Sequence, residues 1–292
     1  MTHIQTIDCL DLKQIADSGQ CFRMLPSPAG GYTIVSRGRL LRVSQEGNRV
    51  SFDCPREDLS FWLTYFDCAT DYAAILTSVD PDNYLRAAAA AGRGIRILRQ
   101  DPWEMIITFV ISQQKTIPCI RRLVEDISRR WGQKIADGDD KNSAVYSFPT
   151  PKELARASLE ELLDLKLGYR AKYIHRLSQD AAAGTLDLKK LETMEYGQAM
   201  EYLTGFYGIG KKVANCVCLF GLHHIEAFPV DTWIEKILLR EYFSAKKYRR
   251  TPKNRLYDTI LADHFGRYGG YAGVLQQYIF YYERLNQHKI SP

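Results

Sequence analysis

The sequence predicts an α+β protein that is mostly helical, in which a small N-terminal antiparallel sheet packs on a large helical body. Three short β-rich runs follow one another between Tyr32 and Phe52 and are separated by turn sequences. After residue 57 nearly every segment carries the spacing and capping residues of helices. The 292 residues are enough for about two domains. We place the sheet domain with its flanking helices at residues 1–98 and the helical body at residues 99–292.

Composition and charge exclude several classes of protein. The residues are 46% hydrophobic and 25% charged, as in ordinary globular proteins, and the net charge of +5 permits an anionic partner. No apolar run approaches the roughly 18 residues of a membrane helix, and Asp8 and Asp11 interrupt the stretch where a signal peptide would be apolar. The seven cysteines include no Cys-x-x-Cys pair, which disfavours a disulfide framework and a four-cysteine zinc site. We therefore expect a reduced, intracellular protein that does not contact a membrane.

The β-rich runs justify the sheet. They are Tyr32–Val35, Leu40–Val43 and Arg49–Phe52. Ser36-Arg37-Gly38 and Glu46-Gly47-Asn48 separate them and are good turn sequences. Because such short connections join antiparallel neighbours, we expect the three runs to pair with one another and to carry no chemistry of their own.

The helical body is predicted from its helix starts. Asp80-Pro81 and Asp101-Pro102 each offer an N-cap followed by proline at the first helical position. In a capping box, side chains satisfy the free amide groups at the start of a helix, and three such boxes are predicted. They lie at Thr150–Glu153, Ser158–Glu161 and Thr232–Glu235. We expect residues 132–143, which are rich in Gly and Asp, to form a polar surface loop.

A helix, a glycine turn and a second helix are predicted between about residues 194 and 220. An amphipathic pattern starts at Met194, Gly208 and Gly210 form the turn, and the second helix starts at Lys211. Glycine lets the backbone approach a ligand, and the free N–H groups at the start of a helix suit a phosphate. We therefore predict that Gly208, Gly210 and Lys211 bind phosphate. The turn alone fits a plain helical hairpin equally well.

The residues after this hairpin make the segment more specific. Ala227-Phe228-Pro229-Val230-Asp231-Thr232 places a carboxylate at the start of the next helix. The stretch from Gly208 to Asp231 resembles the helix-hairpin-helix (HhH-GPD) DNA glycosylases, which carry this hairpin, a Gly/Pro-rich stretch and an aspartate. Further blocks, spread over roughly residues 15 to 285, resemble the 8-oxoguanine DNA glycosylase/lyases of that superfamily. These blocks are Gly19-Gln20-Cys21-Phe22-Arg23, Leu98-Arg99-Gln100-Asp101-Pro102, Leu167-Gly168-Tyr169-Arg170-Ala171-Lys172-Tyr173 and Tyr271-Ala272-Gly273.

The resemblance implies base-excision repair, with removal of 8-oxoguanine from duplex DNA followed by strand cleavage. Lys212 matches the family's amine nucleophile, which attacks C1′ and forms a Schiff base that permits β-elimination. Asp231 matches the catalytic aspartate, which would stabilise positive charge on the sugar and help to activate or orient the amine. From the residues alone, Asp231 also fits a helix N-cap and Lys212 a phosphate contact. The chemistry needs no cofactor or metal, and we do not expect His223, His224 and Glu226 to hold a metal ion.

The resemblance also implies a pocket for the base once it has left the helix stack. Cys216 and Phe280 match its two faces, and Gln276 matches the residue that reads the Watson–Crick edge. The carbonyl of Gly19 matches the acceptor for N7–H, which 8-oxoguanine has and guanine lacks. Singly, Phe280 also fits a core aromatic residue and Cys216 a small buried hydrophobic residue. Their joint match favours the pocket.

A third set of residues matches those that fill the gap left by the flipped base. Gln114, Tyr169 and Arg170 are expected to contact the orphaned opposite base. Ser112-Gln113-Gln114-Lys115 stands where animal enzymes have a run of asparagines. Cys119 stands where they have an arginine that contacts the orphaned cytosine.

Duplex DNA containing 8-oxoguanine is therefore the expected partner, bound by a monomer inside the cell, in the cytoplasm or nucleoid if the source is bacterial. Two other functions stay open. A monofunctional alkylpurine glycosylase keeps the aspartate but lacks the lysine, so Lys212 argues against it. A non-catalytic helix-hairpin-helix module needs the hairpin but not Asp231, Phe280 or Gly19. The last cysteine is Cys218, so we do not expect the C-terminal iron–sulfur cluster of related glycosylases.

We predict looser discrimination of the base opposite the lesion than in the animal enzymes, because Cys119 cannot make the arginine contact. The measurement is the cleavage rate of four duplexes that place 8-oxoguanine opposite each of the four bases. The four rates are expected to lie closer together than those of an animal enzyme. A preference for cytosine as strict as in that enzyme would contradict the prediction.

Overall fold

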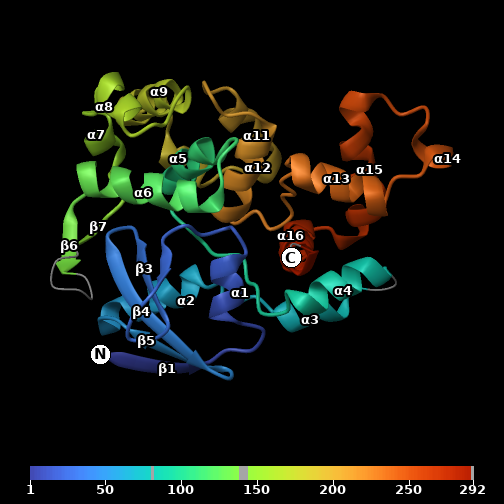
Figure 1. Cartoon of the computed structure of the whole chain (residues 1–292), viewed down its shortest axis with the longest axis horizontal. Helices are drawn as coiled ribbons and strands as arrows, with labels where there is room; N and C mark the ends of the chain where they lie inside the picture. Colours follow the sequence, from blue (N-terminus) through green and yellow to red (C-terminus); the bar gives the residue numbers. More distant parts are fainter. Residues whose placement is uncertain (80–81, 138–143, 291–292) are drawn as a thin grey trace.

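Five antiparallel strands near the N-terminus form a sheet in the order β1-β5-β4-β3-β2, beside a helical body (Figure 1). This computed structural model describes residues 1–79, 82–137 and 144–290. The strands of the sheet are β1 (Thr2–Thr6), β2 (Met24–Pro26), β3 (Tyr32–Ser36), β4 (Arg39–Glu46) and β5 (Arg49–Asp53). The three strands that the sequence predicted are confirmed as β3, β4 and β5. The expected fold class is likewise confirmed.

Most of the remaining chain is helical. The helices of the first part are α1 (Leu12–Asp17), η1 (Arg56–Asp58), α2 (Leu59–Tyr65), α3 (Tyr72–Thr77) and α4 (Asn83–Ala91). Those of the middle are α5 (Pro102–Ser112), α6 (Ile117–Trp131), α7 (Pro151–Leu154), α8 (Leu159–Asp164), α9 (Arg170–Ala182) and α10 (Leu188–Leu191). They are followed by α11 (Tyr196–Thr204), α12 (Lys211–Phe220), α13 (Thr232–Glu241), α14 (Ala245–Tyr248), η2 (Lys253–Arg255), α15 (Leu256–Phe265), η3 (Gly266–Tyr268) and α16 (Ala272–Ile290).

One face of the sheet is apolar because buried side chains alternate along its central strands. Leu41 and Val43 of β4 pair with Ile34 of β3 and Phe52 of β5, and none of the four is more than 2% exposed. They pack with α1 and α2 in one hydrophobic cluster. Removing each of these side chains from water stabilises the fold by about 1.5–3 kcal/mol.

The two outer strands were not predicted. In β1 the residues are mostly polar and alternate only between exposed and half-buried positions, so no apolar period marks the strand. β2 is three residues long and ends at Pro26, which has no N–H to donate to a neighbouring strand. Both strands lie at an edge of the sheet, where burial imposes little on the sequence.

The predicted helix starts are largely confirmed. Asp101 caps α5 by accepting from the amides of Trp103 and Glu104, and Pro102 is the first helical residue. Capping boxes are present at the starts of α7 and α8. Asp80-Pro81 lies outside the described residues, and the side chain that caps α4 belongs to Asp82. The box predicted at Thr232–Glu235 is wrong, because Asp231 is the residue that caps α13.

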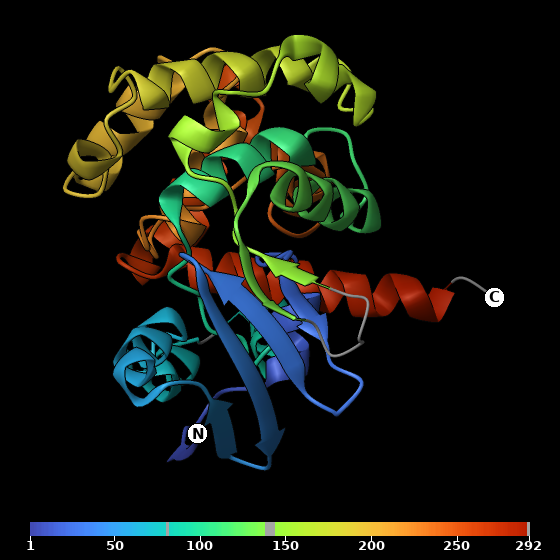
Figure 2. The same cartoon turned by 90° about the vertical axis from the view of Figure 1, so that its left-hand side faces the viewer.

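The polar loop predicted for residues 132–143 is also wrong in part. Lys134–Asp137 forms strand β6, which pairs with β7 (Ala144–Tyr146) in a two-stranded antiparallel sheet. Figure 2 shows this hairpin beside the larger sheet. The error has a physical cause, because short strands with half-exposed side chains have no apolar face that periodicity can detect.

Two hydrophobic clusters hold the chain together. One joins the sheet to α1 and α2, and the larger one joins the helices of the body. Leu85 and Ala88 of α4 belong to the larger cluster, together with Tyr278 of α16. Figure 2 shows α16 crossing the middle of the molecule, and this helix packs on α4. The predicted boundary at residue 98 stays a prediction.

A buried polar junction connects the sheet domain to the body. Arg23, which is 3% exposed, donates from Nε to Glu125 of α6 at 2.8 Å and from Nη2 to the carbonyl of Tyr146 at 2.5 Å. Glu104 of α5 lies near this pair and is 6% exposed. Burial raises the pKa of Glu104 to about 8, although the charge of Arg23 opposes this shift. Glu104 is therefore mostly protonated at neutral pH.

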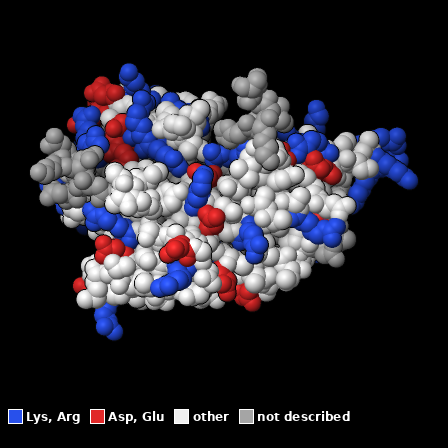
Figure 3. Space-filling model, turned by 60° about the horizontal axis from the view of Figure 1, so that its bottom comes forward, with Lys and Arg blue, Asp and Glu red and all other residues white. Residues whose placement is uncertain are grey.

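The charge distribution is mixed on the face seen in Figure 3, and basic side chains gather at the end where α14 lies. Lys247 of α14 pairs with Asp263 at 3.0 Å, and the buried Tyr248 donates to the same carboxylate at 3.0 Å. Lys247 and Tyr248 thereby attach α14 to α15. In the described ranges no helix is both long and apolar enough to cross a membrane.

Replacing Glu104 with Gln should flatten the dependence of stability on pH. Between the ordinary carboxyl pKa of 4.5 and the folded value of about 8, the folded protein holds a proton that the unfolded chain has lost. The free energy of unfolding therefore falls as pH rises through this window, by up to about 1.4 kcal/mol per pH unit. When Glu104→Gln is unfolded with urea at pH 5, 6, 7 and 8, its free energy of unfolding should lack this fall. Glu160→Gln, at an exposed position, should keep the wild-type slope; equal slopes in both variants would refute the assignment.

Candidate active site

The predicted hairpin is present between α11 and α12 and packs on the ring of Tyr173. Gly208 has a φ of +92°, and a Cβ there would lie 2.4 Å from Cγ of Tyr173, so no other residue fits. Gly210 is the N-cap of α12 with an extended φ of −93°, so only the first of the two glycines needs the left-handed region. The hairpin thereby sets where α12 begins, at Lys211.

The loop after α5 braces this hairpin. Gln113 donates from Nε2 to the carbonyl of Gly208 at 3.1 Å. The carbonyl of Gln113 in turn accepts from Nε of Arg170 at 2.8 Å and also from its Nη2. Arg170, predicted to contact the orphaned base, is only 4% exposed and holds the loop in this unbound form. Three separate segments of the chain are therefore tied together beside the start of α12.

Lys212 lies in the first turn of α12 and is partly buried. Its Nζ donates to Oγ of Ser112 at 3.0 Å and lies 5.3 Å from the centroid of the Phe109 ring. Ser112 ends α5, so the hairpin and the end of that helix together fix the amine. The sequence did not assign a role to Ser112, although it belongs to the loop that was singled out.

Asp231 is the N-cap of α13. Its Oδ1 accepts from the amides of Trp233 at 3.0 Å and Ile234 at 2.8 Å. This corrects the capping box predicted at Thr232, which is instead the first residue of the helix. The carboxylate at position 231 is the stronger acceptor for the free amides and also suits the positive end of the helix dipole. Asp231 is thus held in a fixed orientation at the helix start.

One cavity of about 140 Å³ brings the predicted residues together. Lys212 and Asp231 line it, and so do all four residues predicted for the lesion pocket: Gly19, Cys216, Gln276 and Phe280. A larger cavity of about 540 Å³ also has Lys212 in its wall and is lined by residues of α12, α13 and α15. Because only the smaller one contains Asp231 and the four pocket residues, we take it as the candidate active site.

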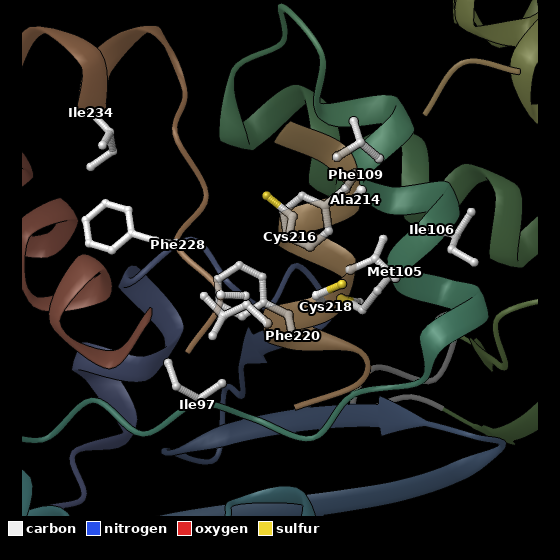
Figure 4. Packing of buried hydrophobic residues seen from close by; sticks show 14 of the residues in the cluster. Ile97, Met105, Ile106, Phe109, Ala214, Cys216, Cys218, Phe220, Phe228 and Ile234 are labelled. Atoms are coloured by element: carbon white, nitrogen blue, oxygen red, sulfur yellow. The ribbon is translucent and has the colours of Figure 1, made fainter. Parts of the chain in front are cut away.

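The two predicted faces of the pocket come from different helices. Cys216 of α12 is 3% exposed and lies with Phe109 and Phe220 where α12 meets α5 (Figure 4). Burial raises the pKa of its thiol, which keeps the sulfur uncharged, although the nearby Lys212 opposes the shift. Phe280 of α16 is partly buried. The sulfur and the ring therefore offer two uncharged surfaces to the same cavity.

Trp233 packs against the Phe280 face. The two rings meet edge to face with centroids 5.0 Å apart. The backbone of Gly19 lies close to the same ring, because a Cβ built there would lie 3.1 Å from Cε1 of Phe280, and its φ is +79°. Trp233 had no role in the sequence analysis, and the structure gives it one as a support for Phe280.

The residues predicted for the gap lie outside the set that lines the cavity. Gln114 is exposed at a φ of +52°. Tyr169 is 44% exposed, with the guanidinium of Arg170 4.4 Å above its ring and Tyr173 against its edge at 5.6 Å. Exposed at the surface, Gln114 and Tyr169 can meet a ligand, whereas Arg170 is already engaged.

At the predicted phosphate site, the N-cap of α12 is Gly210, which has no side chain to cap the helix. In the described structure no side-chain cap occupies the backbone N–H groups at this helix start. Lys211 is 81% exposed and lies 3.8 Å from Asp258 of α15, which is 70% exposed. An ion pair this exposed contributes little to the stability of the fold. A phosphate can therefore replace Asp258 beside Lys211 at small cost.

Two more residues of the cavity were missed. Lys115 lines it and is partly buried, and Gln277 lines it and is 4% exposed. The signal for Lys115 was its place in the loop after α5. Gln277 had none, since it follows Gln276 directly and a second glutamine in a helix carries no pattern of its own.

The histidines that could suggest a metal have other partners. His223 lies 3.1 Å from the buried carboxylate of Asp67, and His224 lies 3.6 Å from Glu226. Burial by itself would raise the pKa of Asp67, but hydrogen bonds, the first of them with His223, lower it. Within the described residues no group of three or more His, Cys, Asp or Glu side chains could hold a metal ion.

Comparisons with known proteins match this architecture. A model of the "8-oxoguanine DNA glycosylase, N-terminal domain" matches residues 3–106, and one of the "HhH-GPD superfamily base excision DNA repair protein" matches residues 107–257. The N-glycosylase/DNA lyase of Saccharomyces cerevisiae is 33% identical over 273 residues, which cover 82% of this chain and 72% of the yeast protein. The probable N-glycosylase/DNA lyase of Methanothermobacter thermautotrophicus is 31% identical over 254 residues, covering 80% and 77%.

A solved structure agrees over almost the whole length. The Clostridium acetobutylicum 8-oxoguanine glycosylase/lyase, in complex with double-stranded DNA containing cytosine opposite 8-oxoguanine, has a TM-score of 0.87 and is 30% identical. The match covers 98% of each chain. The chain therefore belongs to the 8-oxoguanine DNA glycosylase family of the HhH-GPD base-excision DNA repair superfamily and is a homologue of the bifunctional N-glycosylase/DNA lyases.

Proposed function

We propose that this protein excises 8-oxoguanine from duplex DNA and cuts the strand through a Schiff base on Lys212. The observation that carries the proposal is the cavity in which Lys212 and Asp231 meet Gly19, Cys216, Gln276 and Phe280. The Clostridium acetobutylicum relative, which bears the same fold, was solved with DNA that contains the lesion opposite cytosine. A cavity with a fixed amine, a fixed carboxylate and two uncharged faces suits a flipped purine nucleoside.

In the first step the neutral amine of Lys212 attacks C1′ of the lesion nucleotide. The nitrogen lone pair forms the bond to C1′, and the electron pair of the C1′–N9 bond leaves with the base. The nitrogen loses a proton, the C1′–O4′ bond breaks with protonation of O4′, and the Schiff base forms. Removal of a proton from C2′ then breaks the C3′–O3′ bond, and the 3′ phosphate leaves by β-elimination. Ser112 and the Phe109 ring hold the amine at the cavity before attack.

Asp231 stabilises the positive charge that develops on the sugar as the base departs. Both amides of the helix start bond to Oδ1, and no described residue donates to Oδ2. The second oxygen is therefore left for the reacting sugar or for the proton lost by Lys212. Capping and catalysis are compatible roles, because the cap holds the carboxylate in place without neutralising it.

Recognition of the lesion rests on one hydrogen bond at N7. The carbonyl of Gly19 accepts from N7–H of 8-oxoguanine, whereas in guanine the N7 lone pair would face the same oxygen. A buried acceptor that faces a lone pair has no hydrogen-bond partner, which makes binding of guanine less favourable by about 1–3 kcal/mol. Gln276, which is 3% exposed, reads the Watson–Crick edge. The discrimination therefore depends on the placement of Gly19, where a φ of +79° and the nearby Phe280 ring both disfavour a side chain.

The remaining predicted residues hold the DNA around the lesion. Gln114 and Tyr169 are exposed and would fill the gap in the duplex, while the backbone at Gly208 and Gly210 and the side chain of Lys211 would bind phosphate. For Arg170 we propose support of the loop, and contact with the orphaned base only if DNA binding releases its bonds to Gln113. We further propose that the protein acts as a monomer, with the genomic DNA inside the cell.

Trapping with borohydride tests the proposal. Reduction of the Schiff base on a duplex with 8-oxoguanine opposite cytosine should give a covalent protein–DNA adduct with wild-type protein. Lys212→Gln should abolish both adduct and strand cleavage. Lys211→Gln is the matched control and should keep the adduct while binding DNA more weakly, because its side chain is exposed and lies outside the smaller cavity.

Three results would oppose the proposal. An adduct that survives in Lys212→Gln would move the nucleophile to another amine. Base release without any adduct would favour the monofunctional alkylpurine glycosylase. Binding without either reaction would favour the non-catalytic module.

A further inference from the structure

Two consecutive glutamines of α16 form a short chain of hydrogen bonds that ends inside the fold. Gln276 donates from Nε2 to the carbonyl of Pro229 at 3.3 Å. Gln277 donates from Nε2 to Oε1 of Gln276 at 2.9 Å. The two side chains are 3% and 4% exposed, so water does not compete for these bonds.

The direction of this chain follows from its first member. A backbone carbonyl can only accept, so Gln276 must present its NH₂ group to Pro229 and its oxygen to Gln277. Gln277 must then present its own NH₂ group to that oxygen. Its Oε1 is the last acceptor in the chain, and it is buried without a hydrogen-bond partner among the described residues. A buried acceptor that stays unpaired is costly, which makes this oxygen a site for a donor from outside the chain.

Gln277, the residue that carries the unpaired oxygen, lines the active-site cavity. Gln276 and Gln277 lie four and three residues before Phe280, which places all three side chains on one face of the helix. All three line the cavity. A base stacked on Phe280 would therefore present its edge to both glutamines.

We propose that Oε1 of Gln277 accepts a hydrogen bond from the exocyclic 2-amino group of the bound purine, which makes Gln277 a specificity-determining residue. The inference rests on the proposed function and deepens it. Gln276 has already used one N–H on Pro229 and one oxygen lone pair on Gln277. It keeps one N–H for O6 and one lone pair for N1–H. The 2-amino group is then left for Gln277, whose oxygen lacks a donor.

This arrangement distinguishes 8-oxoguanine from 8-oxohypoxanthine, which differs only by the missing 2-amino group. Both bases offer N7–H to Gly19 and the same O6 and N1–H to Gln276. With 8-oxohypoxanthine the oxygen of Gln277 stays unpaired. Wild-type protein should therefore excise 8-oxohypoxanthine about 10- to 100-fold more slowly than 8-oxoguanine.

The experiment compares single-turnover excision of the two bases, each opposite cytosine, by wild type, Gln277→Met and Gln276→Met. Methionine keeps the length of the side chain and removes its hydrogen bonds. Gln277→Met should bring the ratio of the two rates close to one. Gln276→Met should slow both bases and leave much of the ratio in place. Borohydride trapping on a preformed abasic site, which needs no base, checks that each variant is folded and reactive.

A Gln277→Met variant that keeps the wild-type ratio would overturn the inference, whether both rates fall together or neither changes. Equal falls would mean that Gln277 acts only by holding Gln276. A wild-type protein that excises the two bases equally would also overturn it while leaving the proposed function intact. Failure to excise 8-oxoguanine at all would instead refute the proposed function.

Discussion

The contact between Gly208 and the ring of Tyr173 is the constraint on which the site depends. A Cβ at position 208 would lie 2.4 Å from Cγ of this ring, so the backbone of the hairpin packs directly on Tyr173. Hydrogen bonds from Arg170 to Gln113 and from Gln113 to Gly208 hold the hairpin there. Because the hairpin defines the first residue of α12, it also defines where Lys212 emerges and where Cys216 lies one turn later. The packing of the hairpin on Tyr173 thus positions both Lys212 and Cys216.

Two residues of α16 that line the cavity are also spaced one helical turn apart. Gln276 and Phe280 are four residues apart on α16, as Lys212 and Cys216 are on α12, so each helix presents two of the predicted site residues on one face. The two helices are joined through α13, where Asp231 caps the start and Trp233 supports Phe280. Helix capping, ring packing and the proposed catalysis therefore draw on the same few residues. A substitution at Trp233 would disturb the site without touching the base.

Much of this could be predicted from the sequence, and the failures have physical causes. Strands β3 to β5 carry apolar alternation and were found, whereas β1, β6 and β7 lack an apolar face. Thr232 fitted a capping box by pattern, but the neighbouring carboxylate of Asp231 is the stronger acceptor. The six residues of the predicted catalytic pair and lesion pocket, matched through family resemblance, line one cavity. The burial of Arg170 and the unpaired oxygen of Gln277 depend on tertiary packing, which no local pattern reports.

The central claim is that the small cavity between Cys216 and Phe280 holds the flipped lesion. A crystal structure of Lys212→Gln with a duplex containing 8-oxoguanine tests it most directly, because this variant should bind the lesion without cleaving it. We expect the purine to lie between the sulfur of Cys216 and the ring of Phe280, with C1′ near Asp231. A lesion base found in the larger cavity beyond α12, or left stacked in the duplex in a specific complex, would contradict the claim.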